Sequence, residues 1–302
     1  MTPDMHRVPE AAARTCNRPA GQQAVGRGTA ALCLLAAWAA AHAVWCAEPA
    51  SPEGNAQEPT FLGQRGYLTA AQRPDSLMVL PPPPPAGSAA LALDEAIHQE
   101  AAKLRGTPRW EQATRDADLS FPSAAGAFSC ALDAAITERE TPALYRLLER
   151  TMADAAISTF AAKNGYRRLR PFVAHSESSC TPADEARLRD NGSYPSGHSS
   201  IGWTWAMILA QLVPERRNWI MMRGRSYGDS RIVCNVHWES DVVEGRVIAA
   251  ATVAQLQLNR EFRADMETAR EELQSVRSRA LRPGRDCAAE IRVLAVGIPA
   301  AL

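Results

Sequence analysis

The chain has 302 residues, of which 46% are hydrophobic and 22% are charged, and its formal net charge is zero. This length and apolar content suit one or two globular domains with a hydrophobic core. The balanced charge argues against a general nucleic-acid-binding protein, which usually carries a basic excess. Almost all the basic side chains are arginines, so the two lysines, Lys103 and Lys163, stand out.

Residues 1–47 are typical of a targeting segment. Arginines precede an alanine-rich run, TAALCLLAAWAAAHAVWCA, which is shorter than the roughly 20 clean apolar residues of a spanning helix. The small residues of AHA, Ala41 to Ala43, suit a signal peptidase better than WCA, which contains the large Trp45. We expect a cleaved signal peptide and a periplasmic or secreted protein; an uncleaved anchor is the alternative.

Residues 48–87 form a leader with few periodic signals, which contains the stiff polyproline element Pro81 to Pro85. From Ser88 onward the patterns are helical, with Ser or Thr-Pro at the starts and Gly at several ends. We predict helices within residues 88–106, 107–119, 123–136, 141–165, 201–213, 215–228 and 239–280, the last range holding one or two.

No run alternates long enough to indicate a strand. The predicted fold class is all-α, with a single-domain bundle of about eight helices over residues 88–280. Residues 281–302 form a C-terminal extension, whose apolar run is too short to span a membrane.

Four of the seven cysteines lie beyond the targeting segment, at positions 130, 180, 234 and 287. An even number in an exported chain predicts two disulfides, for which three pairings are possible. We favour Cys130–Cys180 and Cys234–Cys287, and four buried thiols are the alternative. No CxxC pair is present, so a structural zinc site is not expected.

Two polar segments lie next to predicted helix ends. In KNGYRRLRP, Lys163 and Arg170 project from a helix end and the loop after it. In PSGH, Ser196, Gly197 and His198 lead into an apolar helix, whose unpaired N–H groups can bind an anion. Both segments could instead have a purely structural role. Lys163 and Arg170 could complement a helix dipole, and Ser196 could be an N-cap beside a surface histidine.

A third polar segment is SRIVCNVHWESD, in which His237 and Asp241 are four residues apart. They share a face if the segment is helical. A carboxylate on one ring nitrogen fixes the tautomer and leaves the other nitrogen as a nucleophile or base. Arg231 adds a fork-shaped anion donor, while a simple His–Asp pair on a helix surface is the alternative.

Together the three segments supply what a tetrahedral oxyanion requires. Cations offset its charge, amides and a hydroxyl bind its oxygens, and two histidines can lie on opposite sides of phosphorus for in-line attack. No cluster of carboxylates is available to hold magnesium, so side-chain cations must do the electrostatic work.

The motif order K-x6-RP, PSGH, SR-x5-H-x3-D is matched without a gap. It resembles the superfamily of type 2 phosphatidic acid phosphatases and vanadium haloperoxidases. The longer segments around these motifs resemble the bacterial class A nonspecific acid phosphatases. These segments are GSYPSGH, YGDSRIVCNVHWESDV, RWEQATRDADLS and the polyproline element before the first helix. The likeness covers roughly Tyr67 to Arg270.

The resemblance implies a role for each group. His237 attacks phosphorus and forms a phosphohistidine, Asp241 orients and polarises it, and His198 protonates the leaving alcohol. The groups that bind the phosphoryl oxygens are then Lys163, Arg170, Arg231, Ser196 and Gly197, with the His198 amide.

The family needs no metal, so we expect no cofactor. The expected partners are phosphomonoester substrates and further copies of the chain in a homo-oligomer, with no dedicated nucleic acid and no membrane after signal removal. Asp229 departs from the family pattern, because it adds negative charge before Ser230 where a neutral polar residue is usual.

Other functions remain open at this point. A vanadate-dependent haloperoxidase or a lipid phosphatase would share the oxyanion pocket. A serine hydrolase elbow needs glycine at position 201, where this chain has Ile201. A non-catalytic periplasmic oxyanion-binding protein explains the cations but not the His237–Asp241 pair.

Overall fold

The computed structural model describes residues 58–298, which fall within one compact unit, Asn55–Leu302. The predicted targeting segment lies outside the described residues. Within them every regular element is helical, and the isolated β-bridge between Phe61 and Gln64 forms no strand. The all-α prediction is therefore confirmed.

Eight α-helices in the described part of the chain have eight residues or more. They are α2 (Ala89–Ala102), α3 (Pro108–Arg115), α5 (Pro142–Ile157), α9 (Gly197–Leu212), α10 (Arg217–Val233), α11 (Glu239–Leu256), α12 (Arg260–Ser278) and α13 (Cys287–Leu294). The shorter elements are α1 (Ser76–Val79), η1 (Ala125–Phe128), α4 (Ser129–Leu132), α6 (Phe160–Tyr166), α7 (Pro171–Ala174), η2 (Pro182–Asp184), α8 (Glu185–Arg189) and η3 (Pro214–Arg216).

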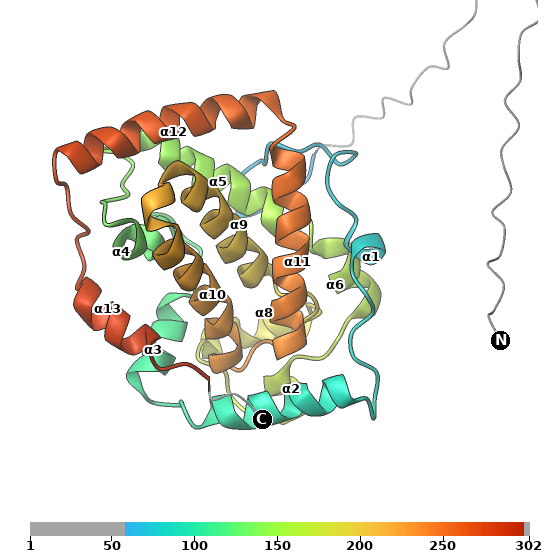
Figure 1. Ribbon diagram of the computed structural model, residues 1–302. Helices are drawn as coiled ribbons and strands as arrows, with labels where there is room; N and C mark the ends of the chain where they lie inside the picture. Colours follow the sequence, from blue (N-terminus) through green and yellow to red (C-terminus); the bar gives the residue numbers. More distant parts are fainter. Residues whose placement is uncertain (1–57, 299–302) are drawn as a thin grey trace, which may run out of the picture. The chain divides into compact units, whose positions relative to one another are not determined.

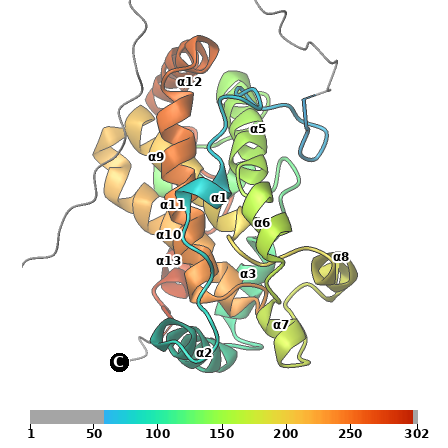
Figure 2. The same ribbon diagram turned by 90° about the vertical axis from the view of Figure 1, so that its right-hand side faces the viewer.

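Helix α9 lies at the centre of the bundle, with α5, α10 and α11 around it (Figure 1). Its Trp205, Ile208 and Leu209 are fully buried, as expected for a helix that is apolar over most of its surface. A Cβ on Gly202 would lie 2.4 Å from the Tyr227 ring, so glycine lets α10 approach closely. In both views α12 lies across one end of the bundle and α2 across the other (Figure 2).

The helix predicted for residues 141–165 is interrupted. Helix α5 ends at Ile157, and the hydroxyls of Ser158 and Thr159 donate to the carbonyls of Asp154 and Ala156 at 2.8 and 2.7 Å. Such side-chain bonds compete with the helical ladder, and a new helix, α6, begins at Phe160. Because Lys163 lies on α6, this break sets its position.

The favoured disulfide pairing is wrong. The structure joins Cys130 to Cys287 and Cys180 to Cys234. Cys234 caps the end of α10, where its carbonyl accepts a hydrogen bond from the Cys180 N–H at 3.1 Å. The count of two bridges is as predicted, but their pairing depends on contacts that cysteine spacing does not reveal.

Residues on both sides of the predicted helical domain pack onto it. In the leader, Tyr67 and Leu80 are buried, and the Tyr67 N–H donates to the Asp154 carboxylate at 2.7 Å. Beyond α12, Cys287 anchors α13 through its disulfide. Within residues 58–298, no helix is both long and apolar enough to cross a membrane.

Candidate active site

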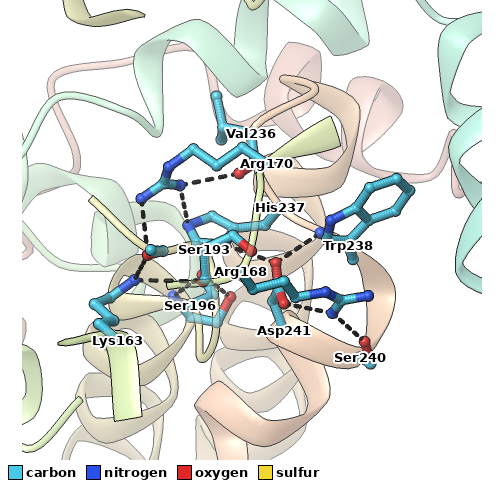
Figure 3. A network of polar contacts seen from close by, with 12 residues as sticks. Lys163, Arg168, Arg170, Ser193, Ser196, Val236, His237, Trp238, Ser240 and Asp241 are labelled. Atoms are coloured by element: carbon cyan, nitrogen blue, oxygen red, sulfur yellow. Dashed lines mark hydrogen bonds and ion pairs between the residues drawn. The ribbon is translucent and has the colours of Figure 1, made fainter. Parts of the chain in front are cut away.

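The three predicted segments meet at one place in the bundle, around the first turns of α9 and α11 (Figure 3). The Ser196 N–H donates to the Asp241 carbonyl at 2.8 Å, which joins these two helix starts. A Cβ on Gly197 would lie 3.8 Å from Lys163 Cε, so α6 also reaches this point. The structure therefore brings all three segments together.

The His237–Asp241 pair is built by a helix start rather than by a helix face. His237 lies before α11, and its Nδ1 is 3.2 Å from Asp241 Oδ2 in the first turn of that helix. The same oxygen accepts a hydrogen bond from the Trp238 N–H at 2.9 Å. The carboxylate thus caps the helix N-terminus and faces the imidazole at once. The pairing agrees with the sequence prediction, but the shared helical face does not exist.

The other ring nitrogen of His237 faces the anion-binding groups. Arg170 donates through one terminal nitrogen to His237 Nε2 at 3.0 Å and to the Val236 carbonyl at 2.9 Å. A guanidinium is only a donor, so Nε2 presents its lone pair and Nδ1 carries the proton toward Asp241. Burial, with Arg170 and Lys163 nearby, lowers the pKa of His237 well below its ordinary value. The neutral imidazole is therefore favoured, and its Nε2 lone pair can act as a nucleophile.

The Nε2 atom of His198 faces an acceptor, whereas that of His237 faces a donor. Its Nε2 lies 3.0 Å from the Ala117 carbonyl, which can only accept, so Nε2–H is the donor and Nδ1 is available. Loss of hydration and the nearby Arg231 lower the pKa of His198 well below its ordinary value. A phosphate ester bound beside it would raise that pKa again and favour the protonated ring.

Three cations, Lys163, Arg170 and Arg231, surround the histidines, and within the described part of the chain none of them forms a salt bridge with a carboxylate. Lys163 Nζ donates to the carbonyls of Gly192 and Ser193 at 2.9 and 3.3 Å. Burial lowers the pKa of Arg170 and of Arg231 to about 10, so both keep their charge at acidic pH.

Arg231 is the cation with unpaired hydrogen-bond donors that a ligand could satisfy. Its side chain is buried, and two of its nitrogens, Nε and one terminal nitrogen, find no hydrogen-bond partner among residues 58–298. Buried unpaired donors are rare and unfavourable, and an oxyanion satisfies such a fork well. Ser196, fully buried at the N-cap of α9, accepts from the Ser199 N–H and hydroxyl at 3.2 and 2.8 Å. Its own hydroxyl hydrogen is thereby left to point at a bound anion.

A cavity of about 150 Å³ lies beside Arg170, between residues 167–173 and 188–192. Its lining residues include Arg167 and Arg189, both exposed, so this wall is basic. Such a wall attracts an anionic substrate toward the buried cations.

Replacing Arg231 with methionine tests its role as an anion donor. We expect the inhibition constant for inorganic phosphate and the KM to rise by about 10- to 100-fold, the range for lost charge-assisted hydrogen bonds. Steady-state kinetics with phosphate as inhibitor measures both values. Arg277→Met is the control, because Arg277 on α12 already pairs with Glu215 at 2.6 Å. Phosphate affinity unchanged in Arg231→Met would contradict the assignment.

Asp229, which departs from the family pattern, pairs with Arg246 at 2.5 Å. Its carboxylate is engaged by Arg246 on α11, so its charge is balanced locally rather than left beside the histidines. The neighbouring Ser230 hydroxyl instead donates to Asp116 at 2.6 Å, while Arg109 donates to that hydroxyl at 2.9 Å. Because Asp116 precedes Ala117, this buried network links the end of α10 to the carbonyl that holds His198.

Sequence reasoning missed several groups at the site. Arg168 donates to Asp241 Oδ1 at 2.7 Å, and Asp94 on α2 lies behind it. Arg168 lies inside the K-x6-RP segment, where its place beside a second arginine was the only signal. Asp94 had none, because it belongs to no recognisable motif. Ala117 lies within RWEQATRDADLS, but it acts through its backbone carbonyl, which residue type does not reveal.

Comparison with known proteins defines the class of this chain. The model of the PAP2 superfamily matches residues 143–261, which include all three motifs. The fold and the site thus belong to that superfamily.

Curated relatives narrow the assignment. A non-specific acid phosphatase of Providencia stuartii is 41% identical over 207 residues, which cover 68% of this chain and 84% of that protein. An acid phosphatase of Zymomonas mobilis is 39% identical over 69% of this chain and 79% of its own length. A non-specific acid phosphatase of Salmonella typhimurium is 39% identical over 66% of this chain and 80% of its own length. The chain belongs to the bacterial class A nonspecific acid phosphatases.

Proposed function

We propose that this acid phosphatase hydrolyses phosphomonoesters with broad specificity, without a metal, through a phosphohistidine at His237. The observation that carries the proposal is the orientation of His237. Nδ1 faces Asp241, and Nε2 faces Arg170 among buried cations that lack an anion. A phosphoryl group placed there would meet a nucleophile and its charge partners together.

In the first step, His237 Nε2 attacks phosphorus and the bond from phosphorus to the ester oxygen breaks. His198 gives a proton to the departing oxygen, which leaves as an alcohol. The cations and the Ser196 hydroxyl bind the equatorial oxygens, where charge gathers in the transition state. The imidazole becomes a cation as it is phosphorylated, and the Asp241 carboxylate stabilises that charge through Nδ1–H.

In the second step, water attacks the phosphohistidine in line with the phosphorus–nitrogen bond. His198, now unprotonated, accepts a proton from this water and is restored to its starting state. His237 leaves as the neutral imidazole, and inorganic phosphate is released. His198 thus donates a proton in the first step and accepts one in the second, and His237 is the nucleophile in the first step and the leaving group in the second.

The test is hydrolysis of p-nitrophenyl phosphate at about pH 5–6, where His198 can carry a proton in the complex. We expect full activity in excess EDTA, because side-chain cations supply the charge, and no group of three or more metal-ligating side chains occurs within residues 58–298. Vanadate should inhibit, since it adopts the trigonal-bipyramidal geometry of the transition state. Activity lost on chelation, or insensitivity to vanadate, would contradict the proposal.

We also propose that the protein is exported to the periplasm or the medium. Two disulfides support this, because such bonds persist in oxidising compartments. Cleavage of a signal peptide within residues 1–47, the domain limits at 88 and 280, and a homo-oligomeric state stay predictions.

A further inference from the structure

A chain of charged groups runs behind His237, away from the phosphate-binding side. Arg168 donates through one terminal nitrogen to Asp241 Oδ1 at 2.7 Å (Figure 3). Its other terminal nitrogen donates to Asp94 Oδ2, also at 2.7 Å. The side chains of Asp94 and Asp241 are 2% and 0% exposed, and that of Arg168 is 10% exposed. These groups are therefore largely shielded from solvent. Charge pairs interact more strongly in such an interior than they do in water.

Asp94 connects this chain to α2, a helix outside the three motifs. Its two oxygens accept from the Ser240 N–H at 2.8 Å and from the Ser240 hydroxyl at 2.6 Å. Arg168 also donates to that hydroxyl at 2.7 Å and lies 5.3 Å from the centre of the Trp238 ring. The group thus clamps residues 238–241, the start of α11 that presents His237 and Asp241.

We propose that Arg168 and Asp94 are positioning residues for the reaction at His237: Arg168 holds Asp241 ionised and oriented toward Nδ1, and Asp94 fixes Arg168 and the first turn of α11. This inference rests on the phosphohistidine function proposed above. Neither residue touches the phosphoryl group. They act through Asp241, so they set the rate of the chemical step rather than the affinity for phosphate.

The charges around Asp241 give the direction of the pH effect. Lys163, Arg170 and His237 face it from the anion-binding side, and Tyr194 lies nearby from the loop before α9. Burial raises the pKa of Asp241, and the nearby Arg168 opposes that rise. Without Arg168 the carboxyl binds a proton at higher pH, and a protonated Asp241 no longer stabilises the developing imidazolium. The acid limb of the pH–rate profile should therefore move to higher pH.

The experiment compares Arg168→Met, Arg168→Lys and Asp94→Asn with wild type, using p-nitrophenyl phosphate. We expect Arg168→Met to lower kcat by about 100-fold, the loss typical of a displaced reacting group, while the inhibition constant for inorganic phosphate stays unchanged. Its acid limb should lie at higher pH. Lysine should restore part of kcat, because it keeps the charge but cannot bridge both carboxylates. Asp94→Asn should lower kcat by less, because Arg168 keeps its charge beside Asp241 but loses an anchor, and the double variant should be non-additive.

Arg150→Met is the matched control. Arg150 also pairs with a carboxylate, Glu261, at 2.5 and 3.0 Å and lies 3.6 Å from the centre of an aromatic ring, that of Tyr67. Its contacts lie in the leader and at the start of α12 rather than among the site residues, so its loss should leave the pH profile as in wild type.

A folded Arg168→Met with wild-type kcat and acid limb would overturn the inference while leaving the proposed function intact. If that variant does not fold, a wild-type kcat in both Arg168→Lys and Asp94→Asn would overturn it equally. Full activity in His237→Ala would instead overturn the proposed function.

Discussion

Replacing His237 with alanine is expected to lower kcat/KM for p-nitrophenyl phosphate by about 10⁴-fold or more, as for other covalent nucleophiles. The substitution removes the Nε2 lone pair that faces the cations, and no neighbouring group is placed to replace it. Arg170 and Ser196 would still bind phosphate, so the inhibition constant for inorganic phosphate should change little. The enzyme is mixed with labelled substrate and the reaction is stopped rapidly in alkali. Label should then be trapped on wild type and not on the variant.

A second histidine provides the control for that experiment. His175 is one-third exposed and pairs with Glu95 at 2.9 Å, outside the cluster of cations. His175→Ala should therefore retain activity and the labelled intermediate. Labelling of His237→Ala at the wild-type level, or its full activity, would exclude this residue as the nucleophile.

Replacing His198 with alanine is expected to make the rate depend steeply on the leaving group. A p-nitrophenolate ion departs without a proton, whereas an alkoxide needs one from a general acid. We expect losses of about 10³-fold for a simple alkyl phosphate and about 10-fold or less for p-nitrophenyl phosphate. The comparison needs only kcat for the two substrates with each enzyme.

The pH dependence of the same variant is a further readout. The first step needs protonated His198, so kcat for an alkyl phosphate in wild type should fall as pH rises through the pKa of His198 in the complex. Neighbouring cations lower that pKa and the bound phosphate raises it. The alanine variant should lose this basic limb. An equal loss on both substrates, with the limb retained, would remove His198 from the role of proton donor.

Motif spacing was sufficient to predict that the chain is an acid phosphatase and that three polar segments come together. Lys163, Arg170 and Arg231 are informative because several cations beside a serine N-cap and two histidines fit one kind of ligand. The helical periodicity and Thr-Pro starts likewise predicted most of the long helices. These signals are local, so they can be read from residues close together in the chain.

The features that sequence analysis missed depend on contacts between distant residues. Asp94 lies 147 positions before Asp241 in the numbering, and only the packing of α2 against the start of α11 brings the two together. The pairing of Cys130 with Cys287 has the same origin. The break after Ile157 was local, but two hydroxyl residues within an otherwise helical pattern were too weak a signal.

Two nitrogens of Arg231 have no hydrogen-bond partner among residues 58–298, and this also bears on how long the folded enzyme survives. Like charges held together out of water favour unfolding, so the site is a weak point in an otherwise well-packed bundle. A bound oxyanion removes that repulsion, and any ligand that binds only the native state stabilises it by mass action. The enzyme's own product is such a ligand. Phosphate released by turnover therefore protects the catalyst from denaturation while it slows catalysis, so resistance to heat and product inhibition rise together.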